Sequence, residues 1–239
     1  MADTTARGAS GPGAVTVDAG PGPQKPPLVI SIGCEYASGG TAVGKLLAEK
    51  LGLEYFDRDF IDGIIERVGI SQQVLDLADA GAAVKGLAAA DAASGRKGAL
   101  GAIKYTNLTE RLVFIQKQVV RKLADRFPCV IIGRCADYIL RGRENLLNVF
   151  IYAPLELRLQ AVMEKFGCRR EEALAQLEAN DAMYHARYQQ ITGTFRGDRH
   201  NRHLLIDASL LGVKGTADYL DDLVRRMETA RAREKEGEE

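Results

Sequence analysis

Short apolar runs alternate with longer amphipathic segments along most of the chain. The apolar runs have the length and composition of strands that are buried on both faces. They occupy residues 28–32, 53–56, 128–133, 147–153 and 203–207. Because parallel strands need crossover connections, this alternation predicts an α/β protein with a doubly wound parallel sheet. Such sheets bind ligands at the carboxyl ends of their strands.

The segments between the runs carry apolar residues at helical spacing. In the first, Val43, Leu47 and Leu51 share one face, and Gly52 supplies a stop signal. A capping-box spacing begins the third helix, and Pro154 suits the start of the fourth. The predicted helices are 41–51, 57–69, 107–125, 155–166, 169–191 and 213–227.

Three segments lack this pattern. Residues 1–27 are rich in Gly, Pro, Ala and Thr without an apolar centre, so we expect a disordered leader and not a secretory signal. Residues 79–104 are rich in Ala and Gly, which predicts a flexible insertion. Residues 231–239 form a charged tail, leaving one domain over 28–230.

Charge and cysteine content narrow the classes of partner. Lys plus Arg equals Asp plus Glu, at 32 each, so no net field attracts nucleic acid or an anionic membrane. No apolar run approaches the ~18 residues of a membrane span. The four cysteines form no CxxC pair, which is typical of reduced thiols in a cytoplasmic protein. A homodimer remains possible.

The stretch GCEYASGGTAVGKLLAEKLG, residues 33–52, follows the first apolar run directly. A loop between a strand and a helix directs backbone N–H groups into one concavity, and the helix start favours an anion. Gly39 and Gly40 allow a phosphate to approach the backbone, and Thr41 lies where a P-loop places its magnesium-binding hydroxyl. Gly40 stands where the P-loop lysine is normally found. The alternative is a tight glycine turn with no ligand.

Several segments in order resemble the cytidylate kinase-like family of P-loop proteins, from about residue 28 to 211. They include ISIGCEYASGGTAVGKLLAEKLGLEYFDRDFI, VIIGRCADYIL, NVFIYAPLELRL, REEALAQLEANDAMYHARYQQITG and LLIDASLLG. Loops of this family commonly lack the lysine. The resemblance implies a P-loop NTPase-type three-layer α/β/α fold with a five-stranded parallel sheet and a helical lid, here over 156–203.

The resemblance also implies an activity: ATP-dependent phosphoryl transfer to a nucleoside monophosphate, cytidylate-like, or to another small phosphate acceptor, with Mg²⁺. The donor phosphates would lie on Ser38, Gly39, Gly40 and Thr41, and Thr41 would reach Mg²⁺ through the nucleotide. The acceptor would lie beside Asp57, Arg58 and Arg134. The expected catalytic residues are Arg158, Asp181 and Arg187.

Other interpretations of these residues stay open. Asp57 could cap the second helix, and Arg134 and Arg158 could be surface ion-pair partners. The polar segment TFRGDRHNRH contains Arg196 and Arg202; it could close over polyphosphate as a lid, although we favour a solvated basic loop. Its HxxH spacing could ligate a metal, but no third ligand is near in the sequence.

Departures from the family pattern support a second functional class. Cys34 and Tyr184 stand where the family usually has arginine, Ala37 where it has glycine, and Ile132 where an acid could contact magnesium. These changes favour a nucleotide sensor without catalysis, whose lid movement a partner detects. A dinucleotide-binding oxidoreductase is a third possibility, because Asp57 follows the loop at about the ribose-binding spacing, but GxGxxG is absent.

Overall fold

The structure is a computed structural model that describes residues 26–70 and 108–236. The predicted insertion at 79–104 and nearly all of the predicted leader lie outside these residues. Within the described part of the chain, every helix is too short or too polar to span a bilayer.

All five predicted strands are present and form one parallel sheet in the order β2-β3-β1-β4-β5. The central position of β1 places the loop that follows it between the ends of β3 and β4. This is the edge at which parallel sheets bind ligands. The strands are β1 Val29–Cys34, β2 Glu54–Phe56, β3 Cys129–Ile132, β4 Leu146–Tyr152 and β5 Leu204–Asp207.

The helices agree with the predicted ones to within a few residues, with two additions. The short helix α6 and the 3₁₀ turn η2 were not predicted, and the last helix continues past residue 230 into the predicted tail. The helices are α1 Gly40–Leu51, α2 Arg58–Arg67, α5 Leu108–Arg126, α6 Ala136–Ile139, α7 Leu155–Phe166, α8 Arg170–Thr192, η2 Arg199–Asn201 and α9 Gly212–Glu236.

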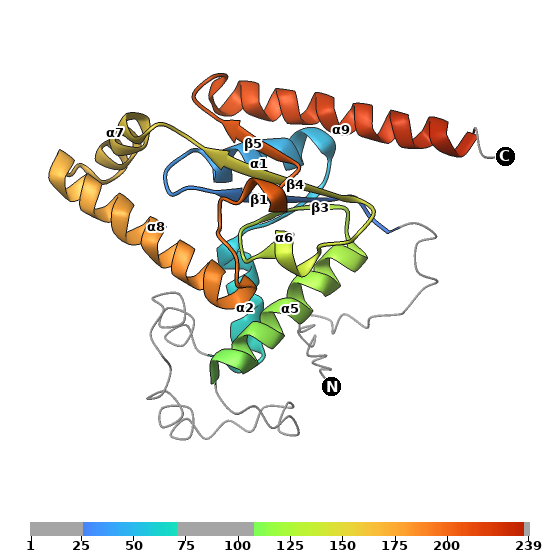
Figure 1. Ribbon diagram of the computed structural model, residues 1–239, viewed down its shortest axis with the longest axis horizontal. Helices are drawn as coiled ribbons and strands as arrows, with labels where there is room; N and C mark the ends of the chain where they lie inside the picture. The colour runs from blue at the N-terminus through green and yellow to red at the C-terminus, as the bar shows by residue number, and fades with distance from the viewer. Residues whose placement is uncertain (1–25, 71–107, 237–239) are drawn as a thin grey trace, which may run out of the picture.

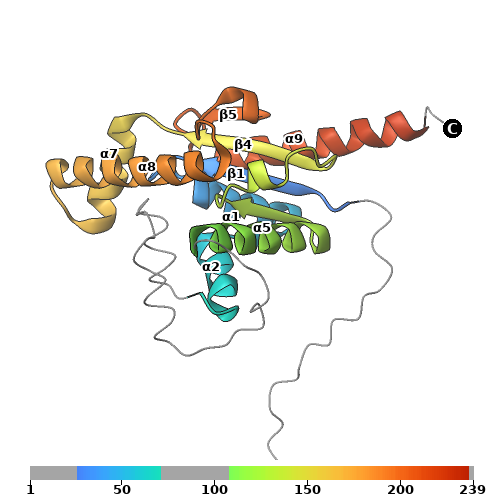
Figure 2. The ribbon, with the colours of Figure 1, turned by 60° about the horizontal axis from the view of Figure 1, so that its bottom comes forward.

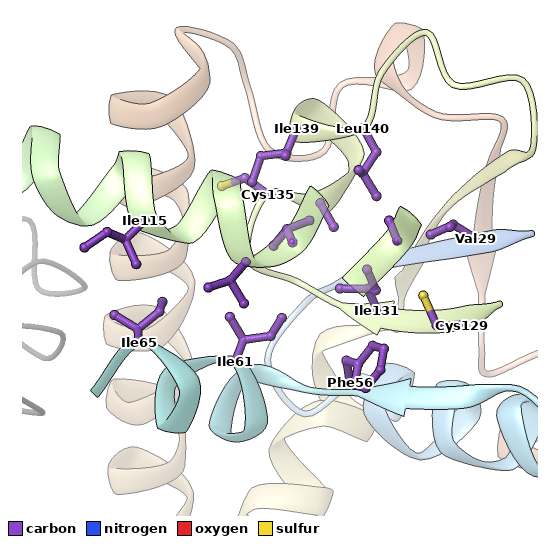
Figure 3. Packing of buried hydrophobic residues seen from close by; sticks show 14 of the residues in the cluster. Val29, Phe56, Ile61, Ile65, Ile115, Cys129, Ile131, Cys135, Ile139 and Leu140 are labelled. Atoms are coloured by element: carbon purple, nitrogen blue, oxygen red, sulfur yellow. The ribbon is translucent and has the colours of Figure 1, made fainter. Parts of the chain in front are cut away.

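The sheet lies between two helical layers (Figures 1 and 2). Successive strand residues face opposite sides, so Ile30 packs with α1 and α9, whereas Val29 packs with α2, α5 and α6. Figure 3 shows the cluster that contains Val29, in which Ile61 of α2 lies toward the sheet and Ile65 lies toward Ile115 of α5. The three-layer α/β/α fold is therefore confirmed.

A helical hairpin, α7 and α8, extends beyond the sheet (Figure 1). Its own core contains Leu159, Val162 and Leu177, and Tyr36 and Ala37 of the glycine loop pack against it. The predicted lid segment therefore touches the predicted phosphate loop directly.

Candidate functional site

Residues 35–39 form a tight loop between β1 and α1. Ala37 and Gly39 adopt left-handed backbone angles, with φ of 60° and 83°. The Ser38 hydroxyl is bonded to the carbonyl oxygens of Glu35, at 2.9 Å, and Ile151, at 3.3 Å. The N-cap of α1 is Gly39, which has no side chain to cap the helix, and the first turn of α1 contains no acid. These first N–H groups therefore remain available to an anion.

Gly40, where a P-loop lysine would stand, has no room for a side chain. A Cβ added there would lie closer than 3.0 Å to the Cβ of Cys34 and 3.3 Å from the Cβ of Ile151. Both neighbours belong to paired strands, since Cys34 of β1 is in register with Ile151 of β4. The absent lysine thus has a steric cause within this sheet.

The glycine loop is held from behind by Arg158 of α7. Its Nε donates to the carbonyl oxygen of Tyr36 at 2.8 Å, and its Nη1 lies 3.2 Å from a carboxylate oxygen of Glu35. Its Nη2 forms a close ion pair with Asp181 of α8, and Asp181 also accepts the N–H of Tyr36 at 3.1 Å. The Arg158–Asp181 ion pair thus holds both the carbonyl oxygen and the N–H group of Tyr36.

A cleft of about 560 Å³ opens in front of the loop. Its lining comes from the loop and the start of α1, the end of β3, and the facing sides of α7 and α8. Among the described residues that line it, Glu35 is the only acid, and Arg158 holds that carboxylate. The basic side chains of the lining are Arg58, Arg134, Lys165, Arg187, Arg196 and Arg202. The cleft therefore suits a polyanionic ligand.

Arg134 and Arg187 are fixed by buried partners. Arg134 follows β3 with a positive φ of 51°, and its guanidinium forms a close ion pair with Asp62 of α2. Gln116 of α5 joins the two arginines: its amide donates to the carbonyl oxygen of Arg134 at 2.8 Å and accepts from Arg187 at 2.7 Å. These contacts orient both cations before any ligand binds.

Arg202 also lines the cleft and is paired with Asp137. The Tyr188 hydroxyl donates to the same carboxylate at 2.6 Å, and burial, together with this acid, raises the pKa of Tyr188. The Arg202 side chain is 1% exposed, so the prediction of a solvated basic loop was wrong at this residue. Arg199 and His200 of the same segment are exposed, as expected.

The structure divides the predicted site residues into three groups. Ser38, Gly39, Gly40, Thr41, Arg58, Arg134 and Arg187 line the cleft together. Arg158 and Asp181 bond to the backbone of Tyr36 and are absent from the lining, and their catalytic role stays a prediction. Asp57 caps α2 by accepting the N–H of Phe60 at 2.9 Å and is absent from the lining, which agrees with its alternative interpretation as a cap.

Sequence reasoning missed the groups that orient these arginines. Asp62 lies on the inward side of α2 between two isoleucines, an unfavourable place for a carboxylate unless a cation meets it. This carboxylate on the apolar face of a predicted helix was the signal from which a cationic partner could have been predicted. Asp137 lies in the segment VIIGRCADYIL, and Gln116 lies within an apolar helical stripe.

The donor set fits a polyphosphate better than a bare metal ion. Within 26–70 and 108–236, no three His, Cys, Asp or Glu side chains are placed to hold a metal. Burial raises the pKa of the Cys34 thiol, and the neighbouring charge of Arg196 and a hydrogen bond with the Thr41 side chain oppose that rise. ATP would therefore lie on the loop amides, and Mg²⁺ would be held by the phosphates and Thr41.

The strand order, with a glycine loop after the central strand, defines a nucleotide kinase-like P-loop protein. More narrowly, the chain belongs to the cytidylate kinase-like family, whose sequence profile matches residues 29–210. It is 22% identical over 202 residues to the cytidylate kinase of Methanocaldococcus jannaschii, covering 82% of this chain and 97% of that one. The crystal structure of an uncharacterized protein from Eubacterium ventriosum has the same fold, with a TM-score of 0.57 and 22% identity over 84% of this chain and 97% of that one.

Proposed function

We propose that this protein is an ATP-dependent phosphotransferase that acts on a nucleoside monophosphate, cytidylate-like, or on another small phosphate acceptor, with Mg²⁺. One observation carries the proposal: guanidinium groups from four separate parts of the chain converge with the glycine loop on one cleft. Phosphoryl transfer depends mainly on positioning and on cations around the transferred group, and this cleft offers both.

The residues divide between the two substrates. The amides at Gly39 and Gly40 would hold the donor phosphates, and Thr41 would hold Mg²⁺ with them. Arg134 would bind the acceptor phosphate, because Asp62 fixes its guanidinium at the end of β3. Arg58 of α2 lies beside the same aspartate, with its Nε 3.5 Å from the carboxylate. Bidentate arginines orient a phosphate better than lysines do.

The test is ADP formation from ATP and Mg²⁺ by the full chain, with CMP, dCMP, UMP, AMP and GMP offered separately. We expect transfer to at least one pyrimidine monophosphate, and its loss in the Gly39→Val variant. ATP binding without ADP formation for any acceptor would overturn the catalytic proposal while leaving nucleotide binding intact.

A nucleotide sensor without turnover is the second candidate, and the Arg158–Asp181 pair favours it. This pair joins α7 and α8 to Tyr36 of the loop, so a ligand that moves the loop would move the hairpin. A sensor would show ATP-dependent hydrogen-exchange changes in α7 and α8 with no ADP formed.

We further propose that the protein acts in the cytoplasm on nucleotides. Within the described residues, Cys34, Cys129, Cys135 and Cys168 are all free thiols, which suits a reducing compartment. A homodimer remains an expectation that sedimentation would test.

A further inference from the structure

Arg196 reaches the glycine loop from the segment that joins α8 to β5. Its Nη2 donates to the carbonyl oxygen of Cys34, the last residue of β1. Its guanidinium carbon lies 5.0 Å from the centre of the Tyr184 ring and 5.7 Å from that of Phe150. The side chain also lines the cleft. These contacts fix a positive charge beside the first residue of the loop.

No acid forms an ion pair with this cation in the described part of the chain: its contacts there are one carbonyl oxygen and two aromatic rings. The neighbouring Arg202 differs, because Asp137 pairs with it. A guanidinium has five N–H donors, and the carbonyl of Cys34 engages one nitrogen. Arg196 therefore keeps donors and a net charge for an anionic ligand.

Cys34 connects this arginine to the missing lysine. The Cβ of Cys34 blocks the direction in which a side chain at position 40 would leave the backbone, and the carbonyl of the same residue holds Arg196. Burial raises the pKa of the Cys34 thiol, and the charge of Arg196 opposes that rise. The positive charge of Arg196 thus acts on the Cys34 side chain, which occupies the space that a lysine side chain at position 40 would need.

The backbone at Arg196 is held in place. Its carbonyl oxygen accepts from Nη2 of Arg202 at 2.9 Å, and Arg202 is itself anchored by the buried Asp137. Behind it, the Thr192 hydroxyl accepts the N–H of Thr194 at 3.1 Å. The cation is therefore positioned before a ligand arrives, which limits the entropy lost on binding.

We propose that Arg196 is the cation of this phosphate loop and binds the donor polyphosphate in place of the lysine that Gly40 excludes. The inference rests on the proposed nucleotide binding and adds a residue to it. Arg158 is a poorer candidate for this charge, because its donors are engaged by Tyr36, Glu35 and Asp181.

The test is calorimetric titration of ATP with Mg²⁺ into the full chain and three variants. Arg196→Gln removes the charge but keeps a hydrogen-bonding amide, and Arg196→Lys keeps the charge. Arg199→Gln removes an exposed arginine three positions along, which is the matched control. We expect Arg196→Gln to weaken ATP by about ten- to hundredfold, Arg196→Lys to recover part of that loss, and Arg199→Gln to stay within about twofold.

Unchanged affinity in Arg196→Gln would overturn the proposal, as would an equal loss in Arg199→Gln or no recovery in Arg196→Lys. If the unaltered protein binds no ATP, the proposed function itself fails and this inference fails with it. The two failures are distinguishable, because a failure of the proposed function is seen in the unaltered protein, whereas a failure of the Arg196 inference is seen only in the variants.

Discussion

Replacing Gly40 by alanine should destabilise the fold, although glycine is ordinarily the poorer residue in a helix. At an open helical site, Gly→Ala gains up to about 1 kcal/mol. At position 40 the new methyl group would lie within 3.0 Å of the Cys34 Cβ and 3.3 Å from that of Ile151, whereas ordinary contact begins at 3.4 Å. Overpacking of this kind costs about 1–3 kcal/mol. After the gain in helix propensity is subtracted, we expect a net loss of up to about 2 kcal/mol.

Urea denaturation of the full chain measures this loss, and Gly63→Ala is the matched control. Gly63 lies inside α2, and a Cβ there would meet nothing within 4 Å, so alanine should raise the free energy of unfolding. If Gly40→Ala also raised it, the described packing at the start of α1 would be wrong. Gly40→Lys meets the same obstacle at its first side-chain atom, so we expect it to weaken nucleotide binding.

A double variant isolates the cause of the loss. Cys34→Gly removes the atoms that Gly40→Ala would strike, so the two substitutions together should cost less than the sum of each alone. For residues in contact, such coupling is about 0.5–3 kcal/mol. Additive losses would mean that Cys34 is not the obstacle.

Three further outcomes follow from the geometry. Gly39→Val should abolish ATP binding while Gly52→Val leaves it unchanged, because both glycines have positive φ but only Gly39 lies on the cleft; titration of the folded variants distinguishes them. Arg134→Ala should lower the free energy of unfolding by up to about 3–5 kcal/mol, because it removes the closest cation from the buried Asp62 and leaves Arg58 beside it at 3.5 Å. Arg134→Met with Asp62→Leu should restore stability but not acceptor affinity. Burial raises the pKa of Cys129 from 9.0 to about 12. The thiol therefore loses its proton at a lower pH in the unfolded chain than in the folded protein, and the free energy of unfolding should fall as pH rises above about 9. Urea denaturation at pH 8 and pH 10 measures this fall, which should be smaller in Cys129→Ala.

The strands could be predicted because each is a short apolar run between polar segments, and burial on both faces requires that composition. The helix α6 could not. It spans four residues and follows three consecutive positive-φ residues, Gly133, Arg134 and Cys135. Two of these are not glycine, so no local preference signals the turn. The contact between Gln116 and the Arg134 carbonyl, from a distant helix, helps to hold it.

The position of the glycine loop between β1 and α1 could also be predicted, because glycine spacing between a strand and a helix is a local signal. The placement of the basic segment after α8 could not. Its many charged residues predict a solvent-exposed loop. Arg202 is nevertheless buried against Asp137, which lies far away in the sequence. Only the folded chain brings that acid within reach, and a single sequence gives no sign of the pairing.

If the loop binds phosphate as we propose, Cys34 explains how it does so without its lysine. A P-loop needs a cation near the phosphates, but the cation need not belong to the loop. In this chain the Cys34 side chain closes the path from position 40, while its carbonyl oxygen receives an arginine from beyond α8. If Arg196 is that cation, restoring lysine at position 40 would add a like charge beside it and disturb the strand that holds it. The glycine at 40 and the arginine at 196 then depend on each other, and the absent lysine is no argument against nucleotide binding.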